Sequence, residues 1–223
     1  MPSVIKALVF AASGTLFDVH SVVTLCDRLF PGRGTPLSQL WRAKQLEYTW
    51  QRSLMGRYVD FAEITRDALE YACKVLHLPL AAGTSAQLMA AYDSLVLYPE
   101  ARDALAALPR FKIAILSNGS PAMLDPLVEN AGLDKLLHSV LSVDAVKAYK
   151  PDPRVYQLAV GRLGVAAAEI GFVSANYWDA AGASSFGFRV FWINRSGIER
   201  DRLGAEPHLV LQSLAELAAS VGY

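Results

Sequence analysis

The stretch VIKALVFAASGT, residues 4–15, joins an almost unbroken apolar run to a short polar turn. Apart from Lys6, the run from Val4 to Phe10 is apolar on both alternating faces, which is typical of a strand buried in a parallel sheet. The same pattern, followed each time by polar residues, recurs at residues 112–116, 170–173 and 190–193. These runs predict a parallel sheet whose first strand ends at Phe10.

Segments with the apolar spacing of helices lie between the predicted strands, at residues 99–108, 121–131, 153–163 and 178–186. Strands that alternate with helices of this length predict an α/β fold with a doubly wound parallel sheet. The interval from Val19 to Val96 differs, because it holds two long amphipathic segments and no convincing strand. These segments are residues 37–55 and 61–76. We therefore predict a core domain of residues 1–18 plus 97–223 and a helical cap domain of residues 19–96.

The composition of the chain excludes several broad classes of protein. Its 223 residues are 53% hydrophobic and 19% charged, which suits a large core and not a disordered chain. Lys and Arg together number 21, as do Asp and Glu, so no excess of positive charge favours nucleic acid or an anionic membrane. There is no secretory cleavage pattern and no apolar stretch near the ~20 residues that span a bilayer. We expect a soluble cytoplasmic protein with neither nucleic-acid nor membrane partners.

Metal and disulfide chemistry is not indicated by the sequence. The two cysteines, Cys26 and Cys73, lie on apolar segments and are interpreted as packing residues. The four histidines are scattered without the spacing of metal ligands. We therefore expect no metal and no cofactor.

Polar residues follow the predicted strands, and each group taken alone has an ordinary structural explanation. Gly14 and Thr15 suit a tight turn, residues 117–120 suit a helix N-cap, and Lys150 suits an exposed surface position. Residues 174–179 likewise suit a helix start. In doubly wound sheets, however, ligands bind beyond the carboxyl ends of the strands. We expect these four groups to meet at one edge of the sheet and to form a site there.

Five motifs in this order resemble the haloacid dehalogenase superfamily, and specifically its (S)-2-haloacid dehalogenase branch. The family typically reads Phe-Asp-Ala-Tyr-Gly-Thr-Leu-Phe-Asp at its first strand, where this chain reads FAASGTLFD over residues 10–18. The other similar segments are residues 40–48, 117–119, 149–156 and 174–179. The likeness extends from Val4 to about Arg195. It implies the HAD-like Rossmannoid fold with a helical cap after the first strand, a small 2-haloacid as substrate, and a homodimer.

The chemistry implied by the resemblance is a two-step hydrolysis. An aspartate at the end of the first strand displaces halide from the substrate Cα, and water then hydrolyses the aspartyl ester to an (R)-2-hydroxy acid. The implied catalytic set is Ala11, Thr15, Arg42, Ser117, Lys150, Tyr156, Ser174, Asn176 and Asp179. The implied substrate-binding set is Ala12, Ser13, Arg42, Leu46, Phe61, Ser117, Asn118 and Trp178. In these sets Arg42 would receive the halide, and Lys150 would counter the charge of the nucleophile.

Position 11, where the family has its nucleophilic aspartate, is alanine. A methyl group cannot attack carbon, and Asp18 lies beyond the turn, so we expect the chain as written to be inactive. Two interpretations stay open, an engineered knock-out of an active enzyme and a natural homologue that only binds small carboxylates. We favour the first, because Arg42, Lys150 and Asp179 are all retained.

Two further departures concern the shape of the pocket, since Ser13 stands where the family usually has tyrosine and Ala43 where it usually has glutamine. We predict that they change the preferred halogen or chain length.

A phosphatase of the same superfamily is a less favoured alternative. Such enzymes hold magnesium with an acid at position 13 and an acidic pair in the last motif, where this chain has Ser13, Asn176 and Asp179.

Overall fold

The computed structural model describes residues 4–221 and centres on a six-stranded sheet of order β5-β4-β1-β6-β7-β8. Every neighbouring pair of strands in it is parallel. The strands are β1 (Ala7–Phe10), β4 (Lys112–Ser117), β5 (Ser139–Ser142), β6 (Ile170–Ser174), β7 (Arg189–Ile193) and β8 (Leu209–Leu211). In the centre Phe10 pairs with Ile115 on one side and Val173 on the other. All four residues of β1 are buried, which explains its continuous apolar run.

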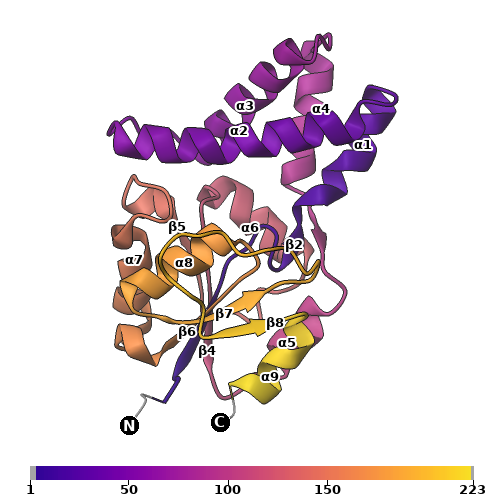
Figure 1. Cartoon of the computed structure of the whole chain (residues 1–223). Coiled ribbons are helices and arrows are strands. Elements are labelled where there is room, and N and C mark those ends of the chain that lie inside the picture. The colour runs from indigo at the N-terminus through magenta and orange to yellow at the C-terminus, as the bar shows by residue number, and fades with distance from the viewer. Residues whose placement is uncertain (1–3, 222–223) are drawn as a thin grey trace.

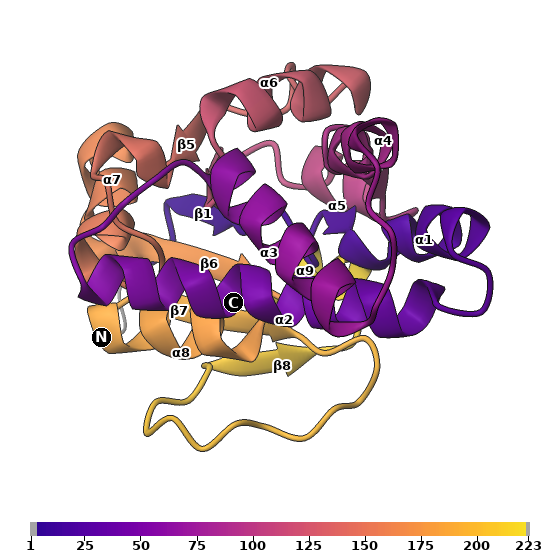
Figure 2. The ribbon, with the colours of Figure 1, turned by 90° about the horizontal axis from the view of Figure 1, so that it is seen from above.

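Helices cover both faces of the sheet, as Figures 1 and 2 show. On one face α7 (Pro153–Leu163) packs against β4 and β5, and α8 (Tyr177–Phe186) packs against β6 and β7. On the other face lie α5 (Ala101–Ala106) and α9 (Leu217–Ser220), while α6 (Pro121–Asn130) follows β4 and contacts β5. This arrangement confirms the predicted doubly wound α/β fold.

A layer of helices lies above the carboxyl edge of the sheet (Figure 1). It consists of α1 (Val23–Leu29), α2 (Gly34–Leu54), α3 (Phe61–Val75) and α4 (Ala82–Tyr92). A short antiparallel pair, β2 (Phe17–Asp18) and β3 (Val96–Leu97), lies where the chain leaves the core and returns to it. Within residues 4–221, none of the helices combines the length and the apolar character needed to cross a membrane. The division of the chain into a core domain and a cap domain stays a prediction.

Local sequence explains how the helical layer forms. Asp60 caps α3, because its side chain accepts a hydrogen bond from the Glu63 N–H at 2.9 Å. Behind this cap, Ile64 and Ala68 recur at helical spacing and are fully buried. Cys26 and Cys73 are free and buried, as predicted for packing residues.

The structure departs from the predicted strands mainly at the edges of the sheet. The first strand begins at Ala7 and not at Val4, which is exposed. The sequence analysis also missed β5 and β8. Both are edge strands, and neither is fully buried. β5 reads SVLS, with a serine at each end, and β8 has only three apolar residues, LVL, so neither shows the longer apolar run of the central strands.

Hydrogen bonds tie the end of α2 and the loop after it to the segment that precedes Lys150. The Tyr149 N–H donates to Ser53 Oγ at 2.9 Å, and the Tyr149 hydroxyl donates to the Val59 carbonyl at 2.7 Å. The Tyr58 hydroxyl donates to Asp144 Oδ1 at 2.9 Å, and its ring stacks on that of Tyr149. These contacts hold the helical layer against the core beside the candidate site.

Candidate active site

A small cavity of about 30 Å³ lies between the helical layer and the carboxyl ends of β1, β4 and β6. It is lined by Ala11, Ala12, Ser13, Arg42, Leu46, Phe61, Leu116, Ser117, Asn118, Gly119, Lys150, Asn176, Trp178 and Asp179. All but Leu116 and Gly119 belong to the residue sets proposed from the sequence. The fold thus brings together residues that lie far apart in the chain, from Ala11 to Asp179. Their individual roles stay predictions.

Three residues of the expected catalytic set do not line the cavity. Thr15, Tyr156 and Ser174 are fully buried and lie behind the residues that do. The Thr15 Oγ1 accepts a hydrogen bond from the Ala175 N–H at 2.9 Å and so joins the turn after β1 to the loop after β6. In this structure these three residues support the lining from behind, and their roles in the reaction stay predictions.

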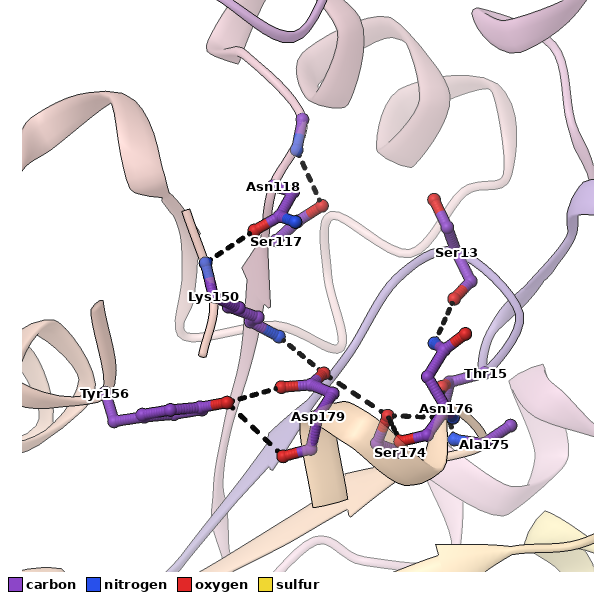
Figure 3. Close-up of polar contacts among 11 residues, drawn as sticks. Ser13, Thr15, Ser117, Asn118, Lys150, Tyr156, Ser174, Ala175, Asn176 and Asp179 are labelled. Atoms are coloured by element: carbon purple, nitrogen blue, oxygen red, sulfur yellow. Dashed lines mark hydrogen bonds and ion pairs between the residues drawn. The ribbon is translucent and has the colours of Figure 1, made fainter. Parts of the chain in front are cut away.

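An ion pair between Lys150 and Asp179 forms the polar centre of the site (Figure 3). The Lys150 Nζ donates to Asp179 Oδ2 at 2.9 Å, and both side chains are almost completely buried. Burial lowers the pKa of Lys150 below its ordinary value, and the Asp179 carboxylate opposes that shift. Because the two groups lie out of water, their charges act more strongly on a ligand than they would at the surface.

Two hydroxyl groups hold the Asp179 carboxylate from behind. The Tyr156 hydroxyl donates to Asp179 Oδ1 at 2.9 Å, and the Ser174 hydroxyl donates to Asp179 Oδ2 at 3.2 Å (Figure 3). Burial raises the pKa of Tyr156 well above its ordinary value, so the phenol keeps its proton and its role as a donor. Gly182 makes this approach possible, since a Cβ there would lie 2.6 Å from the Tyr156 hydroxyl oxygen. The sequence analysis missed Gly182, for which a glycine inside a helical pattern was the available signal.

The end of β4 offers hydrogen-bond donors that other residues leave free. Ser117 Oγ accepts from the Gly119 N–H at 3.0 Å, and Asn118 Oδ1 accepts from the Lys150 N–H at 3.2 Å. Within residues 4–221 neither of the two donors, the Ser117 hydroxyl hydrogen and the Asn118 Nδ2, has a hydrogen-bond partner. Both residues line the cavity, so both can donate to an anion or to a halogen substituent there.

The end of β6 contributes an acceptor. Asn176 Nδ2 donates to the Ser13 carbonyl at 3.0 Å, which fixes the orientation of the side-chain amide (Figure 3). Its Oδ1 has no partner in the described part of the chain. Since Asn176 lines the cavity, this oxygen is available to a water molecule.

Arg42 on α2 supplies the second cation of the cavity. Its Nη1 donates to Gln45 Oε1 at 2.6 Å. Burial lowers the pKa of the guanidinium from its usual range, but arginine remains protonated in proteins. Of the lining residues Arg42 and Lys150 are cationic and Asp179 is anionic, so these side chains carry a net charge of one positive unit. Gln45, the partner of Arg42, was not identified from the sequence.

Apolar side chains complete the cavity. Leu46, Phe61 and Trp178 line it, and the Trp178 ring meets the Trp50 ring edge-on at 5.6 Å. Ser13 also lines the cavity, as the argument about pocket shape requires. Ala43 lies exposed on α2 and does not line the cavity. Its effect on substrate preference stays a prediction.

The residues do not form a metal centre. Within residues 4–221 no group of three or more His, Cys, Asp or Glu side chains lies close enough to hold an ion. In the cavity itself the one carboxylate, Asp179, is already bound to Lys150, Tyr156 and Ser174.

Comparison with known proteins agrees with this geometry. The chain is 52% identical to an (S)-2-haloacid dehalogenase of Pseudomonas sp. (strain YL) over 94% of this chain and 91% of that protein. It is 43% identical to haloacetate dehalogenase H-2 of Moraxella sp. (strain B), over 96% of this chain and 98% of that protein. An L-2-haloacid dehalogenase structure from Xanthobacter autotrophicus, solved with chloropropionic acid covalently bound, matches with a TM-score of 0.92 and 44% identity, covering 97% of this chain and 98% of that one.

The family model of haloacid dehalogenase-like hydrolases matches residues 5–187, which include β1, the helical layer and the loops that line the cavity. The match spans most of the chain, and the fold is that of a solved L-2-haloacid dehalogenase from Xanthobacter autotrophicus, with a TM-score of 0.92. The chain therefore belongs to the haloacid dehalogenase-like hydrolase family.

Proposed function

We propose that this site is built to hydrolyse (S)-2-haloacids to (R)-2-hydroxy acids and halide, and that the chain as written binds such acids without converting them. The observation that carries the proposal is the lining of the cavity. Two cations, Arg42 and Lys150, line the same cavity as Ala11, which follows the first strand. The sequence similarity to several (S)-2-haloacid dehalogenases supports the same substrate class.

The proposed reaction requires an aspartate at position 11. One carboxylate oxygen forms a bond to the substrate Cα as the carbon–halogen bond breaks, and the halide leaves with the bonding electrons. Water then adds to the carboxyl carbon of the resulting ester, which breaks the acyl C–O bond and regenerates aspartate. The bond to Cα is inverted once, so an (S)-acid gives an (R)-product. The covalent chloropropionic acid complex of the Xanthobacter relative supports a covalent route.

The residues on the core side of the cavity would bind the substrate carboxylate, the nucleophile and the hydrolytic water. The free donors of Ser117, together with the backbone N–H groups near Ala12 and Ser13, would bind the substrate carboxylate. Lys150 would stabilise the nucleophilic carboxylate, with Asp179 holding the ammonium in place. Asn176 Oδ1 would orient the hydrolytic water.

The halogen would be held from the opposite side. Arg42, on the helical layer, would receive the leaving halide, and Asn118 Nδ2 would lie beside it. Leu46, Phe61 and Trp178 would exclude bulk water, which strengthens the electrostatic interactions in the closed cavity.

A magnesium-dependent phosphatase is the weaker alternative, because the cavity offers too few oxygen ligands. Ser13 stands in place of the second acid, and the Asp179 carboxylate is occupied by Lys150. Restoring an aspartate at position 11 would still leave only one additional carboxylate.

Whether Ala11 is engineered or natural is decided by codon 11 of the encoding gene. Homodimerisation and a cytoplasmic location stay predictions.

The test of the proposal is the variant Ala11→Asp with (S)-2-chloropropionate. The parent chain should release no chloride above background, whereas Ala11→Asp should release chloride and form (R)-lactate. The gain should reach several orders of magnitude, because the substitution restores the covalent route itself. In heavy-oxygen water, a single turnover should place the label on the carboxylate at position 11.

Ala11→Leu is the matched control, because leucine has the branched shape of aspartate without its oxygens. It should fold and remain inactive. If Ala11→Asp folds like the parent but releases no halide from any 2-haloacid, the dehalogenase proposal fails. The chain is then a binding protein for small carboxylates.

A further inference from the structure

The cation on the helical layer, Arg42, is held by a neutral group. Its Nη1 donates to Gln45 Oε1 at 2.6 Å, and in the described part of the chain no carboxylate pairs with it. By contrast, the core cation Lys150 pairs directly with Asp179. The amide fixes the guanidinium in position but does not neutralise its charge.

The orientation of the Gln45 amide is determined by a residue on the neighbouring helix. Gln45 Nε2 donates to Thr65 Oγ1 at 2.7 Å, and Thr65 Oγ1 donates to the Phe61 carbonyl at 2.6 Å. A hydroxyl has one hydrogen, so Thr65 can only accept from Gln45 once it donates to Phe61. The amide nitrogen therefore faces Thr65, and the amide oxygen faces Arg42.

The donors form a directed chain from the cavity into the helical layer, running from Arg42 to Gln45, from Gln45 to Thr65, and from Thr65 to Phe61. Both Gln45 and Thr65 are fully buried, so water does not compete for these bonds. Trp41 adds rigidity, because its Nε1 donates to the Thr65 carbonyl at 2.8 Å. A buried chain of hydrogen bonds that each run in one direction favours one arrangement of the Gln45 amide.

We infer that Gln45 and Thr65 are positioning residues that hold Arg42 against the leaving halogen while keeping its positive charge available. The inference rests on the proposed function, in which the halide departs toward Arg42. A glutamate at position 45 would hold the guanidinium as well but would neutralise it. A residue at position 65 without a hydroxyl would leave the amide free to turn its nitrogen toward Arg42, where two donors would face each other.

The prediction concerns one step of the reaction and not the other. Negative charge develops on the halogen only while the ester forms, so a misplaced or neutralised Arg42 should slow that step. Hydrolysis of the ester takes place at the carboxyl carbon of residue 11, on the core side of the cavity. It should not depend on Gln45 or Thr65.

The experiment compares the two steps in the Ala11→Asp background. Single-turnover mixing with (S)-2-chloropropionate gives the rate of chloride release, and mass spectrometry of quenched protein gives the decay of the ester. Adding Thr65→Val should slow chloride release by about tenfold, the equivalent of one lost hydrogen bond to a charged group, and leave ester decay within about twofold. Gln45→Glu should slow chloride release at least as much.

Thr65→Ser is the matched control, since it keeps the hydroxyl and should retain most of the rate of chloride release. Equal slowing of both steps would show a general structural role and would overturn the inference. So would unchanged chloride release in both Thr65→Val and Gln45→Glu. If Thr65→Val does not fold, Gln45→Glu and Thr65→Ser give the decision. Absence of chloride release from Ala11→Asp alone would instead refute the proposed function, and the inference with it.

Discussion

Replacing Tyr156 with phenylalanine tests the buried polar centre most directly. The change removes the hydroxyl that donates to Asp179 Oδ1 at 2.9 Å but leaves the ring, which packs edge-on against Phe172 and Phe188. Within residues 4–221 no other donor pairs with that carboxylate oxygen. A hydrogen bond to a charged group contributes about 1.5–3 kcal/mol, and a buried oxygen left without a donor incurs its full desolvation cost. We therefore expect Tyr156→Phe to lower the free energy of unfolding by about 2–3 kcal/mol.

Tyr149→Phe is the matched control, because Tyr149 is equally buried and its hydroxyl donates to a neutral group, the Val59 carbonyl, at 2.7 Å. A neutral hydrogen bond contributes about 0.5–1.5 kcal/mol, so this variant should lose about 1 kcal/mol. Urea unfolding, followed by both tryptophan fluorescence and circular dichroism, measures the two values and checks that the transitions coincide. If Tyr156→Phe costs no more than Tyr149→Phe, the charged character of the bond to Asp179 is refuted.

The pH dependence of the Tyr156→Phe effect has a definite sign. Burial raises the pKa of Tyr156 in the folded chain, so its contribution is fully present below the unfolded pKa of about 10. It is lost only as pH rises beyond that value. The stability difference between the parent and Tyr156→Phe should therefore be constant from about pH 6 to 9 and shrink above about pH 10.

Three further predictions concern the cavity. Calorimetry should show that propionate binds the parent at least tenfold more tightly than it binds Ala11→Asp. Tenfold requires about 1.4 kcal/mol, and like charges about 4 Å apart repel by up to about 4 kcal/mol at an effective dielectric constant of 20. Equal affinities would contradict this electrostatic account. Halide release by Ala11→Asp should survive EDTA, and loss of activity that magnesium restores would instead favour a phosphatase-type site. Adding Ser13→Tyr to Ala11→Asp should lower kcat/KM for 2-chlorobutyrate relative to kcat/KM for chloroacetate, since the larger side chain fills part of a small cavity. If the ratio of the two kcat/KM values does not change, Ser13 does not determine the preferred chain length.

The central part of the fold was predictable because strands that are buried on both faces of the sheet have continuous apolar runs in the sequence. The strands around Phe10, Ile115 and Val173 are of this kind. The edge strand Ser139–Ser142 begins and ends with serine, and the edge strand Leu209–Leu211 is apolar but only three residues long, so neither stands out in the sequence. Their pairing depends on neighbours that are distant in the chain.

The candidate site was predictable to the extent that its residues sit in motifs at strand ends. Lys150, Asn176 and Asp179 are examples, and all three line the cavity. Gln45 and Gly182 were missed for a different reason. The Gln45 amide is held by Thr65, which is 20 residues away on another helix, and Gly182 matters because Tyr156 passes close to its backbone. Neither relation follows from residue type or spacing.

The two cations of the cavity are supported differently, and the proposed reaction explains why. Ester formation moves one negative charge from residue 11 on the core side to the halide on the side of the helical layer, so the total charge of the site does not change. The barrier therefore depends on how strongly each side attracts that charge in the transition state. Lys150, paired with Asp179, presents a partly compensated charge to the nucleophile, which must remain reactive. Arg42, paired with the neutral Gln45, presents a full charge to the departing halide. In the proposed reaction these two choices of partner would create an electrostatic gradient from Lys150 toward Arg42, which would favour displacement over return of the halide.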